Sequence, residues 1–356
     1  MRIIDKQNLE NIAAGAAVLG TGGGGDPHVG KLMAMAAIEK YGPVTLLSPQ
    51  EVGDDDWVVS ASMTGAPSIL VEKIPSGTEV IRAFEAICEY SEKEIKAIYP
   101  IEIGGVNSIV PLVLGAITGL PVVDTDGIGR AFPELQMVTF HLAGLQSAPL
   151  SVADEKGNTL IVTGIDNQWN ERIIRAALIA MGGSVMVCSN LMQGRVLKAE
   201  GIHHTLTLAE KIGETVHGLR HRNENPIAAL VDVLEGKLLF EGKINNLLRR
   251  NAGGFTRGEV YFDGINRYQG KQAMISFQNE FLVATIDQQP VVTTPDLIMI
   301  LDLETGFPIT TEVLRYGNRA AIVAMPCDAK WRTEKGLQTA GPRYFGYDID
   351  YIPLQV

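Results

Sequence analysis

The stretch AIYPIEIGGVNSIVPLVLGAITGLPVVDTD, residues 97–126, decides the fold class of this chain. It predicts a strand over 97–105, a helix over 107–119 and a second strand over 121–126, because two β-branched apolar runs flank a longer apolar segment. A strand, a helix and a strand in this order place the two strands parallel in one sheet. We therefore expect a mainly parallel sheet with helices on both faces.

The same alternation runs through the first half of the 356-residue chain, and the second half differs. Beyond about residue 236 the apolar runs become short and are separated by Gly, Pro and Asn turns, a pattern typical of β-rich domains. A chain of this length exceeds one typical core. The sequence thus predicts a three-layer α/β domain over residues 1–168 and, over 169–356, a domain of mixed helices followed by β-rich structure.

The net charge and the cysteine content limit the binding partners and the cellular compartment that we expect. The net charge is −11, which argues against nucleic acid and anionic membranes as partners. Three cysteines without a CxxC spacing favour reduced thiols and a cytoplasmic location. The uncharged stretch 106–123 contains two prolines, so we expect a buried helix and a strand there instead of a membrane span.

Four consecutive glycines stand in VLGTGGGGDPHVGKL, residues 18–32. Gly20, Gly22 and Gly25 match the dinucleotide spacing, but that motif follows a strand and these glycines follow a predicted helix. A phosphate loop would also need Gly-Lys-Ser/Thr, which the run lacks. A nucleotide site is therefore disfavoured.

The same run fits the floor of a small-molecule site. Asp26 at the N-cap and Pro27 at the first position start a second helix, so free backbone N–H groups gather there. The alternative is a tight turn between two helices, which needs fewer glycines. The binding residues expected here are Gly22, Gly23, Gly24, Gly25, Asp26 and His28.

A second constellation follows the strand at 121–126. Two carboxylates close together in a closed site cannot both ionise easily, so one of Asp124 and Asp126 could act as general acid or base. Arg130 and Glu134 complete this group of catalytic candidates. The alternative is an Asx turn at the edge of the sheet, with Arg130 and Glu134 as a surface pair.

Other strand ends supply small polar residues. Thr64, the pair Gly104–Gly105, and Asn107 each stand at or just after the end of a predicted strand. Ligands of open α/β sheets bind beyond the carboxyl ends of the strands. We therefore expect these residues to join one shared pocket as substrate-binding residues.

The histidines carry no metal assignment. The chain has no HxH or HExxH spacing, so we assign no metal ligand, although a divalent metal stays compatible with the sequence. The sequence requires no cofactor. His141 is included as a catalytic candidate because it could donate a proton at the same site.

Several motifs together resemble the DUF917 family, which is described as S-methyl thiohydantoin desulfurase-like and includes neighbours of hydantoinases and oxoprolinases. The resemblance covers about residues 8–350 and is carried by LGTGGGGDP, VVDTDGIGRAFPE, GGFTRGEV, FQNEFLVA and the segment 294–326. It implies an α/β domain followed by a β-rich domain. It also implies hydrolysis of an S-methylated thiohydantoin to a hydantoin with loss of methanethiol.

For such a reaction we expect Asp124 or Asp126 to be the base and Arg130 to stabilise the developing charge. The other aspartate or His141 would donate the proton. Asp126→Asn should then lower kcat by orders of magnitude with the fold intact. For Asn279 and Glu280 in the second domain, strand pairing or an interface is favoured over substrate contact.

Three other interpretations are compatible with the sequence. The chain could be a non-catalytic, ligand-sensing subunit of a hydantoinase or oxoprolinase system, a metal-dependent cyclic-amide hydrolase, or a nucleotide-binding protein. The expected partners are a small heterocycle, further copies of the chain in a homo-oligomer, and a hydantoinase-type protein.

Overall fold

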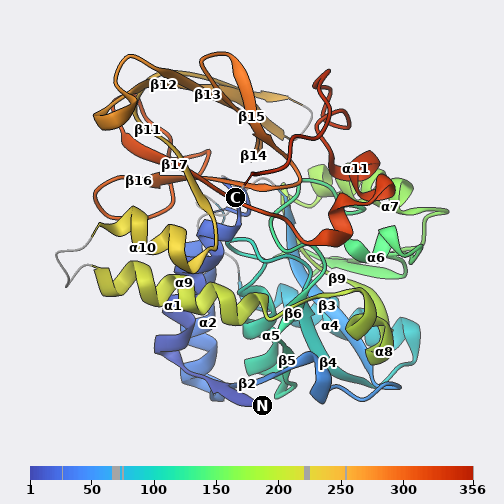
Figure 1. The fold of residues 1–356 in the computed structure, drawn as a ribbon. Helices are drawn as coiled ribbons and strands as arrows, with labels where there is room; N and C mark the ends of the chain where they lie inside the picture. Colours follow the sequence, from blue (N-terminus) through green and yellow to red (C-terminus); the bar gives the residue numbers. More distant parts are fainter. Residues whose placement is uncertain (26, 66–72, 74–75, 220–224, 253–254, 356) are drawn as a thin grey trace.

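An α/β half and a strand-rich half lie one above the other in the molecule (Figure 1). The computed structural model describes residues 1–25, 27–65, 73, 76–219, 225–252 and 255–355. The α/β half contains the N-terminus, and the strand-rich half is formed by the later part of the chain. Both halves of the expected fold class are confirmed.

The first sheet has eight strands in the order β1-β2-β5-β4-β3-β9-β7-β8. The four strands β2, β5, β4 and β3 are parallel, and the other four pair antiparallel, so the sheet is mixed with a parallel centre. The strands are β1 (Arg2–Ile4), β2 (Val44–Leu47), β3 (Trp57–Gly65), β4 (Ile95–Pro100), β5 (Val122–Val123), β7 (Leu150–Ala153), β8 (Thr159–Val162) and β9 (Ser184–Gln193). A two-stranded ladder joins β6 (Thr125–Asp126) to β10 (Ile202–His203).

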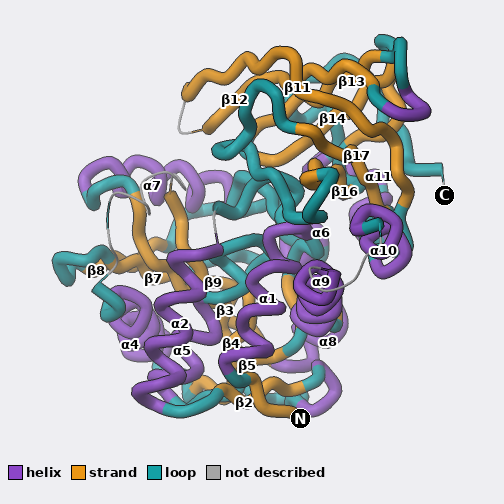
Figure 2. Tube along the Cα trace, turned by 90° about the vertical axis from the view of Figure 1, so that its left-hand side faces the viewer, coloured by secondary structure: helices purple, strands orange, loops and turns teal. Residues whose placement is uncertain are grey.

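Helices pack on this sheet. The helix expected after β4 is α5 (Val110–Thr118), which packs directly on the parallel strands because almost all of its side chains are apolar. The helix α2 (Pro27–Tyr41) packs against α5 and against α1 (Lys6–Leu19), and Figure 2 shows these three helices as neighbours. The helix α4 (Glu79–Ser91) packs on β7 and β9.

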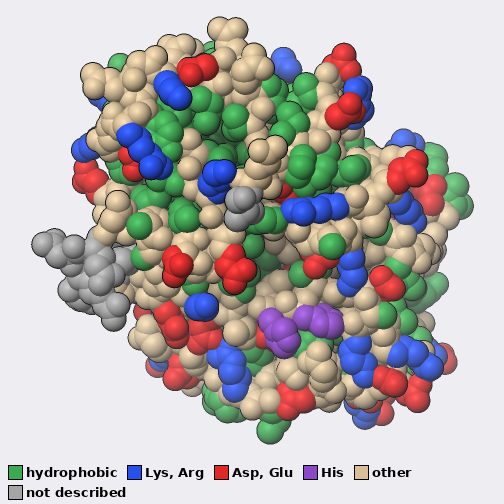
Figure 3. Space-filling model, in the orientation of Figure 1, with side chains coloured by type: hydrophobic (Ala, Val, Ile, Leu, Met, Phe, Trp, Pro, Cys, Tyr) green, Lys and Arg blue, Asp and Glu red, His purple; other side chains and the backbone are tan. Residues whose placement is uncertain are grey.

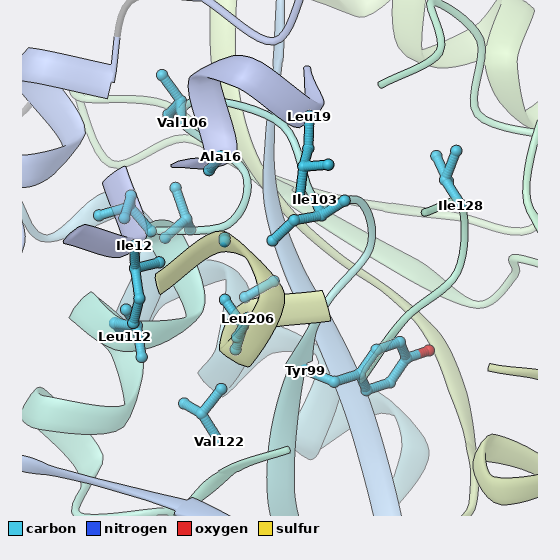
Figure 4. Close-up of a cluster of buried hydrophobic side chains, with 14 of the residues drawn as sticks. Ile12, Ala16, Leu19, Tyr99, Ile103, Val106, Leu112, Val122, Ile128 and Leu206 are labelled. Carbon is cyan, nitrogen blue, oxygen red and sulfur yellow. The ribbon is translucent and has the colours of Figure 1, made fainter. Parts of the chain in front are cut away.

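The core of the α/β half joins segments that are far apart in the sequence. Ile12 and Ala16 of α1 lie with Leu112 of α5 and Leu206 of α9 (Thr205–Leu219) in one buried cluster (Figure 4). Ile128, in the loop after β6, belongs to the same cluster. The loops that follow the parallel strands are therefore fixed by the main core.

The remaining helices lie around the edges of the two halves. They are α6 (Thr139–Leu142), α7 (Asn167–Ala180), α8 (Gly194–Glu200), α10 (Pro226–Val233) and α11 (Glu334–Ala340), with 3-10 turns η1 (Pro49–Glu51), η2 (Asn266–Tyr268) and η3 (Ala329–Arg332). Among the described residues we find no helix whose length and hydrophobicity suit a membrane span. The uncharged stretch 106–123 forms the buried α5 and β5, as expected.

The strand-rich half is one antiparallel sheet of seven strands in the order β15-β14-β13-β12-β11-β17-β16. It curves around its own apolar cluster, which includes Phe240, Phe262, Phe277 and Phe281. Its strands are β11 (Lys237–Ala252), β12 (Phe255–Gly264), β13 (Gln272–Gln278), β14 (Glu280–Ile286), β15 (Gln289–Thr293), β16 (Leu297–Asp302) and β17 (Arg319–Met325). The strand β9 lies beyond the expected boundary at residue 168 and nevertheless pairs with β3 in the first sheet. The division at residue 168 stays a prediction.

Candidate active site

A cavity of about 110 Å³ lies where the two halves meet. Its walls come from the carboxyl ends of β3 and β4 and from the loop after β5 and β6, the edge at which open α/β sheets bind ligands. The glycine loop, α7 and the turn between β13 and β14 complete it. The described lining residues are Gly24, Ser62, Met63, Thr64, Gly65, Ile101, Glu102, Asn107, Ile128, Phe132, Pro133, Glu134, Leu135, Val138, Glu171, Arg175, Ser189, Asn279 and Glu280.

The glycine run is explained by how closely other backbone and side-chain atoms approach it. A Cβ atom on Gly23 would lie 2.1 Å from Oε1 of Glu280, and one on Gly22 would lie 2.4 Å from the ring of Phe281. On its other side, a Cβ on Gly24 would lie 2.8 Å from the backbone nitrogen of Gly105. The loop is thus confined between the strand-rich half and the loop after β4, and side chains there would push Glu280 away.

Backbone hydrogen bonds hold the glycine loop against both halves. Phe281 N donates to Thr21 O at 2.7 Å, and Thr311 N donates to Gly22 O at 2.9 Å. From the α/β half, Val106 N donates to Gly24 O at 2.9 Å. The position of Glu280 relative to the α/β half is therefore fixed by the glycine loop.

Glu102 is a buried acid in the wall of the cavity. Its Oε1 accepts a hydrogen bond from Nδ2 of Asn107 at 2.8 Å, and its Oε2 accepts one from Phe132 N at 3.2 Å. Asn107 is itself held by Met63 N, which donates to its Oδ1. Burial raises the pKa of Glu102 to about 7, while these two donors act in the opposite direction.

Glu280 is the second buried acid of the cavity and is 3% exposed. Its Oε2 has no hydrogen-bond partner among the described residues, although it is fully buried. Burial and the nearby carboxyl of Glu102 raise its pKa well above the ordinary value, and Arg130 only partly opposes this. These surroundings favour the protonated form of Glu280.

Arg130 lies fully buried behind these two acids. Its Nε donates to Ala131 O, and its Nη1 donates to the carbonyls of Pro295 and Asp296. Its Nη2 donates to Thr21 Oγ1 and to Phe281 O. All five N–H groups of the guanidinium thus have acceptors within the protein, and Arg130 ties the glycine loop to β14.

Each of the two aspartates after β5 directs one oxygen at backbone donors, and the buried Oδ1 of Asp126 has no partner among the described residues. Oδ2 of Asp126 accepts from the amides of Ile103, Ile128 and Gly129 at 2.7–3.0 Å. Burial raises the pKa of Asp126 to about 7 against these three donors. Neither Asp126 nor Asp124 is among the described lining residues of the cavity.

Asp124 serves the start of α9. Its Oδ1 accepts from the amides of Leu206 and Thr207 at 2.9 and 3.1 Å, and its Oδ2 accepts from Thr207 Oγ1. Nδ1 of His204 lies 3.5 Å from Oδ2 of Asp124, and the His204 side chain is largely exposed. This arrangement satisfies helix-terminal N–H groups with a side chain that is remote in sequence.

The outer part of the cavity carries two further acids and one base. Glu171 forms an ion pair with Arg175, whose Nη2 also donates to Pro133 O. Oε2 of Glu134 accepts from Gln136 Nε2 and from the Tyr344 hydroxyl at 2.6 Å. The guanidinium of Arg175 lies over the ring of Phe255, 4.4 Å from its centroid.

The structure brings part of the expected site together. Of the expected residues, Gly24, Thr64, Asn107 and Glu134 line the cavity. The glycines Gly22, Gly23, Gly25, Gly104 and Gly105 are not among the described lining residues. Gly22 and Gly23 lie against Phe281 and Glu280, and Gly105 lies against the backbone of Gly24 and Gly25.

Two expected residues lie elsewhere and one is not described. His141 is half-buried on α6 and accepts a hydrogen bond from Asn167 Nδ2, and burial lowers its pKa. His28 lines a different cavity, between α1, α2 and the segment 307–313. Asp26 lies outside the described residues.

The sequence alone did not predict Glu102, Glu171 or Arg175 as site residues. Glu102 stands at a strand end beside Gly104–Gly105, which is the same signal that pointed to Asn107. For Glu280 the sequence favoured strand pairing or an interface over contact with a substrate. Its meeting with Glu102 depends on how the second sheet docks, for which we found no local sequence signal.

Among the described residues, no group of three or more His, Cys, Asp and Glu side chains is arranged to hold a metal ion. Figure 3 shows Lys and Arg side chains interspersed with Asp and Glu on the face that it draws, and hydrophobic side chains gathered over the strand-rich half.

Comparisons with known proteins agree with this architecture. A crystal structure of a protein from Chromobacterium violaceum is 24% identical, covers the whole of both chains and superposes with a TM-score of 0.82. This likeness shows the shared fold. No curated protein sequence matches the chain. Family models do match it: the S-Me-THD-like N-terminal domain over residues 7–164 and the S-Me-THD-like C-terminal domain over residues 165–354. The chain therefore belongs to the S-Me-THD-like family.

Proposed function

We propose that this protein is a hydrolase of small cyclic amide or thiohydantoin-type heterocycles, which converts an S-methylated thiohydantoin to a hydantoin and releases methanethiol. The observation that carries the proposal is the pair Glu102 and Glu280, two buried acids from different halves that line one cavity. Their raised pKa values suit acid–base chemistry near neutral pH. Membership of the S-Me-THD-like family supports the substrate class.

The two acids have different surroundings, so we assign them different roles. Glu102 has a pKa of about 7 and two hydrogen-bond donors that favour its charged form, so it serves as the general base. Burial and the nearby carboxyl of Glu102 favour the protonated form of Glu280, whose Oε2 has no partner among the described residues, so Glu280 serves as the general acid. This division follows the rule that neighbouring acids in different surroundings take opposite roles.

In the proposed reaction Glu102 takes a proton from water as the water oxygen bonds to the carbon that bears the S-methyl group. Glu280 gives its proton to the ring nitrogen that is doubly bonded to this carbon. The carbon–sulfur bond then breaks, and the sulfur leaves as methanethiol with the proton held by Glu102. The new hydroxyl returns its proton to Glu280 as the carbonyl forms, so both acids are restored.

Other residues position this pair and the substrate. Asn107 and the amide of Phe132 orient Glu102, and the glycine loop with Arg130 orients Glu280. Thr64 and Glu134, which also line the cavity, are proposed substrate contacts. The catalytic roles expected from the sequence for Asp124, Asp126, Arg130 and His141 stay predictions. The Asp124 and Asp126 variants described below test two of them.

The test is an assay of methanethiol release from an S-methylated thiohydantoin by the purified protein, followed with a thiol reagent. We expect turnover by the wild type and its loss in both Glu102→Gln and Glu280→Gln. Glu210→Gln is the matched control, because Glu210 is a buried acid that pairs with Arg2 away from the cavity. Turnover by the two cavity variants at the wild-type rate would contradict the proposed roles, and no release by the wild type would contradict the substrate class.

A further inference from the structure

The side chain of Glu134, in the wall of the cavity, is held through one of its two oxygens. Oε2 of Glu134 accepts hydrogen bonds from Gln136 Nε2 and from the Tyr344 hydroxyl. Gln136 Nε2 also donates to the Tyr344 hydroxyl at 3.0 Å, so the three side chains form one network. Among the described residues, none donates a hydrogen bond to Oε1 of Glu134. That oxygen is therefore the one that a ligand in the cavity can use.

The backbone on both sides of Glu134 is fixed by α7. Arg175 Nη2 donates to Pro133 O at 2.7 Å, and Leu135 N donates to Oε2 of Glu171 at 3.2 Å. Glu171 and Arg175 form an ion pair, so the two contacts support each other. A carboxylate that is fixed at its backbone and at one oxygen loses little further freedom when it binds a ligand.

Tyr344 reaches Glu134 from the segment 341–350, which follows α11. In the same segment Phe345 and Tyr347 line a hollow of the strand-rich half. Burial and the hydrogen bond to Glu134 raise the pKa of Tyr344, so its hydroxyl keeps the proton that it donates. The chain near the C-terminus thus holds an acid of the α/β half in place at the cavity.

We infer that Glu134 recognises the ring N–H of the substrate through Oε1, and that Tyr344 and Gln136 are its positioning residues. This inference rests on the proposed function and deepens it, because it names the part of the heterocycle to which the site is specific. In an S-methylated thiohydantoin, the carbon that bears the sulfur is doubly bonded to one ring nitrogen. The other ring nitrogen on that carbon carries a hydrogen and needs an acceptor when it is buried.

The N–H contact gains strength during the reaction. When Glu280 protonates the doubly bonded nitrogen, positive charge spreads over both nitrogens through the carbon between them. The N–H group then becomes a stronger donor, and its hydrogen bond to a carboxylate is charge-assisted. Glu134 would therefore bind the transition state more tightly than the substrate, which is how a fixed acceptor contributes to catalysis.

The test compares an S-methylated thiohydantoin with its two ring N-methyl isomers in the methanethiol assay. Each isomer lacks the N–H group and keeps one nitrogen doubly bonded to the reacting carbon. Glu134→Gln should lower kcat/KM for the N–H substrate by about 10–100-fold, the usual loss when a hydrogen bond to a charged group is removed. The values for the isomers should change far less. An equal loss on all three substrates, or a wild type that does not prefer the N–H substrate, would overturn the inference.

Tyr344→Phe removes one donor to Glu134 and tests the positioning. It should lower kcat/KM for the N–H substrate by about 3–10-fold, as for one neutral hydrogen bond, and leave the values for the N-methyl isomers unchanged. Tyr347→Phe is the matched control, because it loses a hydroxyl from the same segment at a residue outside the described lining of the cavity. A loss that Tyr347→Phe shares, or that is equal for all three substrates, would overturn the role of Tyr344.

A binding measurement separates this inference from the proposed reaction. Isothermal titration calorimetry gives the Kd values of hydantoin, 1-methylhydantoin and 3-methylhydantoin without any turnover. We expect the penalty for one of the two methyl groups to shrink by at least ~tenfold in Glu134→Gln. Unchanged penalties for both methyl groups would overturn the N–H recognition. No methanethiol release by the wild type, with the shrinking penalty observed, would instead contradict the reaction and leave the recognition standing.

Discussion

This molecule contains two pairs of buried acids, and the two pairs differ in the surroundings of their carboxylate oxygens. Asp124 and Asp126 follow one strand, and their oxygens accept hydrogen bonds chiefly from backbone amides of neighbouring loops and of α9. Glu102 and Glu280 come from different halves and line a cavity. Backbone donors hold one oxygen of each acid in the first pair, whereas the second pair lies in the wall of the cavity.

The comparison teaches that a raised pKa alone does not identify a catalytic acid. Asp126 and Glu102 both have a pKa of about 7 because of burial. Three backbone donors occupy Oδ2 of Asp126, and its buried Oδ1 has no partner among the described residues. Glu102 has two donors on its carboxylate and lines the cavity, which Asp126 does not among the described residues. Access to a ligand separates the two acids.

The largest expected effect is on turnover in the cavity pair. Glu102→Gln and Glu280→Gln should each lower kcat by about 10²–10⁴-fold, the usual contribution of a general acid or base. Asp126→Asn should change kcat far less, because the side chain is absent from the described lining. Steady-state kinetics with the methanethiol assay measures all three. A loss in Asp126→Asn as large as in Glu102→Gln, with the fold intact by circular dichroism, would reverse the comparison.

The second prediction concerns stability against pH. The pKa of Asp126 is raised in the folded state, so its burial costs little below about pH 4 and most above pH 7. Asp126→Asn removes this cost. The free energy of unfolding of the variant minus that of the wild type should therefore be ~2–3 kcal/mol larger at pH 8 than at pH 5. Urea denaturation at the two pH values measures the difference. A difference that does not change with pH would mean that Asp126 is not the buried titrating group.

A third variant tests the glycine loop. Gly23→Ala places a Cβ 2.1 Å from Oε1 of Glu280, so we expect displacement of that side chain and a loss of about 1–3 kcal/mol of stability, as in other overpacked sites. Turnover should fall with it. Gly218→Ala in α9 is the control, because a Cβ there meets no atom within 4 Å. Equal activity of the two variants would remove the loop from the positioning of Glu280.

The smallest effect is expected at Asp124, the other acid of the pair that follows β5. Asp124→Ala leaves the amides of Leu206 and Thr207 without their side-chain acceptor, which should cost about 1–2 kcal/mol of stability, as in other lost N-caps. The kcat value should stay close to that of the wild type. Thermal unfolding and the methanethiol assay on one preparation separate the two effects. A large fall in kcat with little loss of stability would return Asp124 to the mechanism.

The sequence by itself determined the α/β half, the strand-rich half and the edge of the sheet at which the cavity lies. These features follow from local periodicity and from the rule that ligands bind beyond the carboxyl ends of parallel strands. For the same reason the polar residues at strand ends, Thr64 and Asn107, could be placed at the site from the sequence.

Only the tertiary structure decided which acids share the cavity and why the glycines are needed. Glu280 meets Glu102 because the turn between β13 and β14 docks on the glycine loop, some 260 residues earlier in the chain. Local periodicity carries no information about such a contact, since it depends on the packing of two sheets. The Asp-x-Asp motif was visible in the sequence, but whether its oxygens face backbone amides or a cavity is a property of the folded chain.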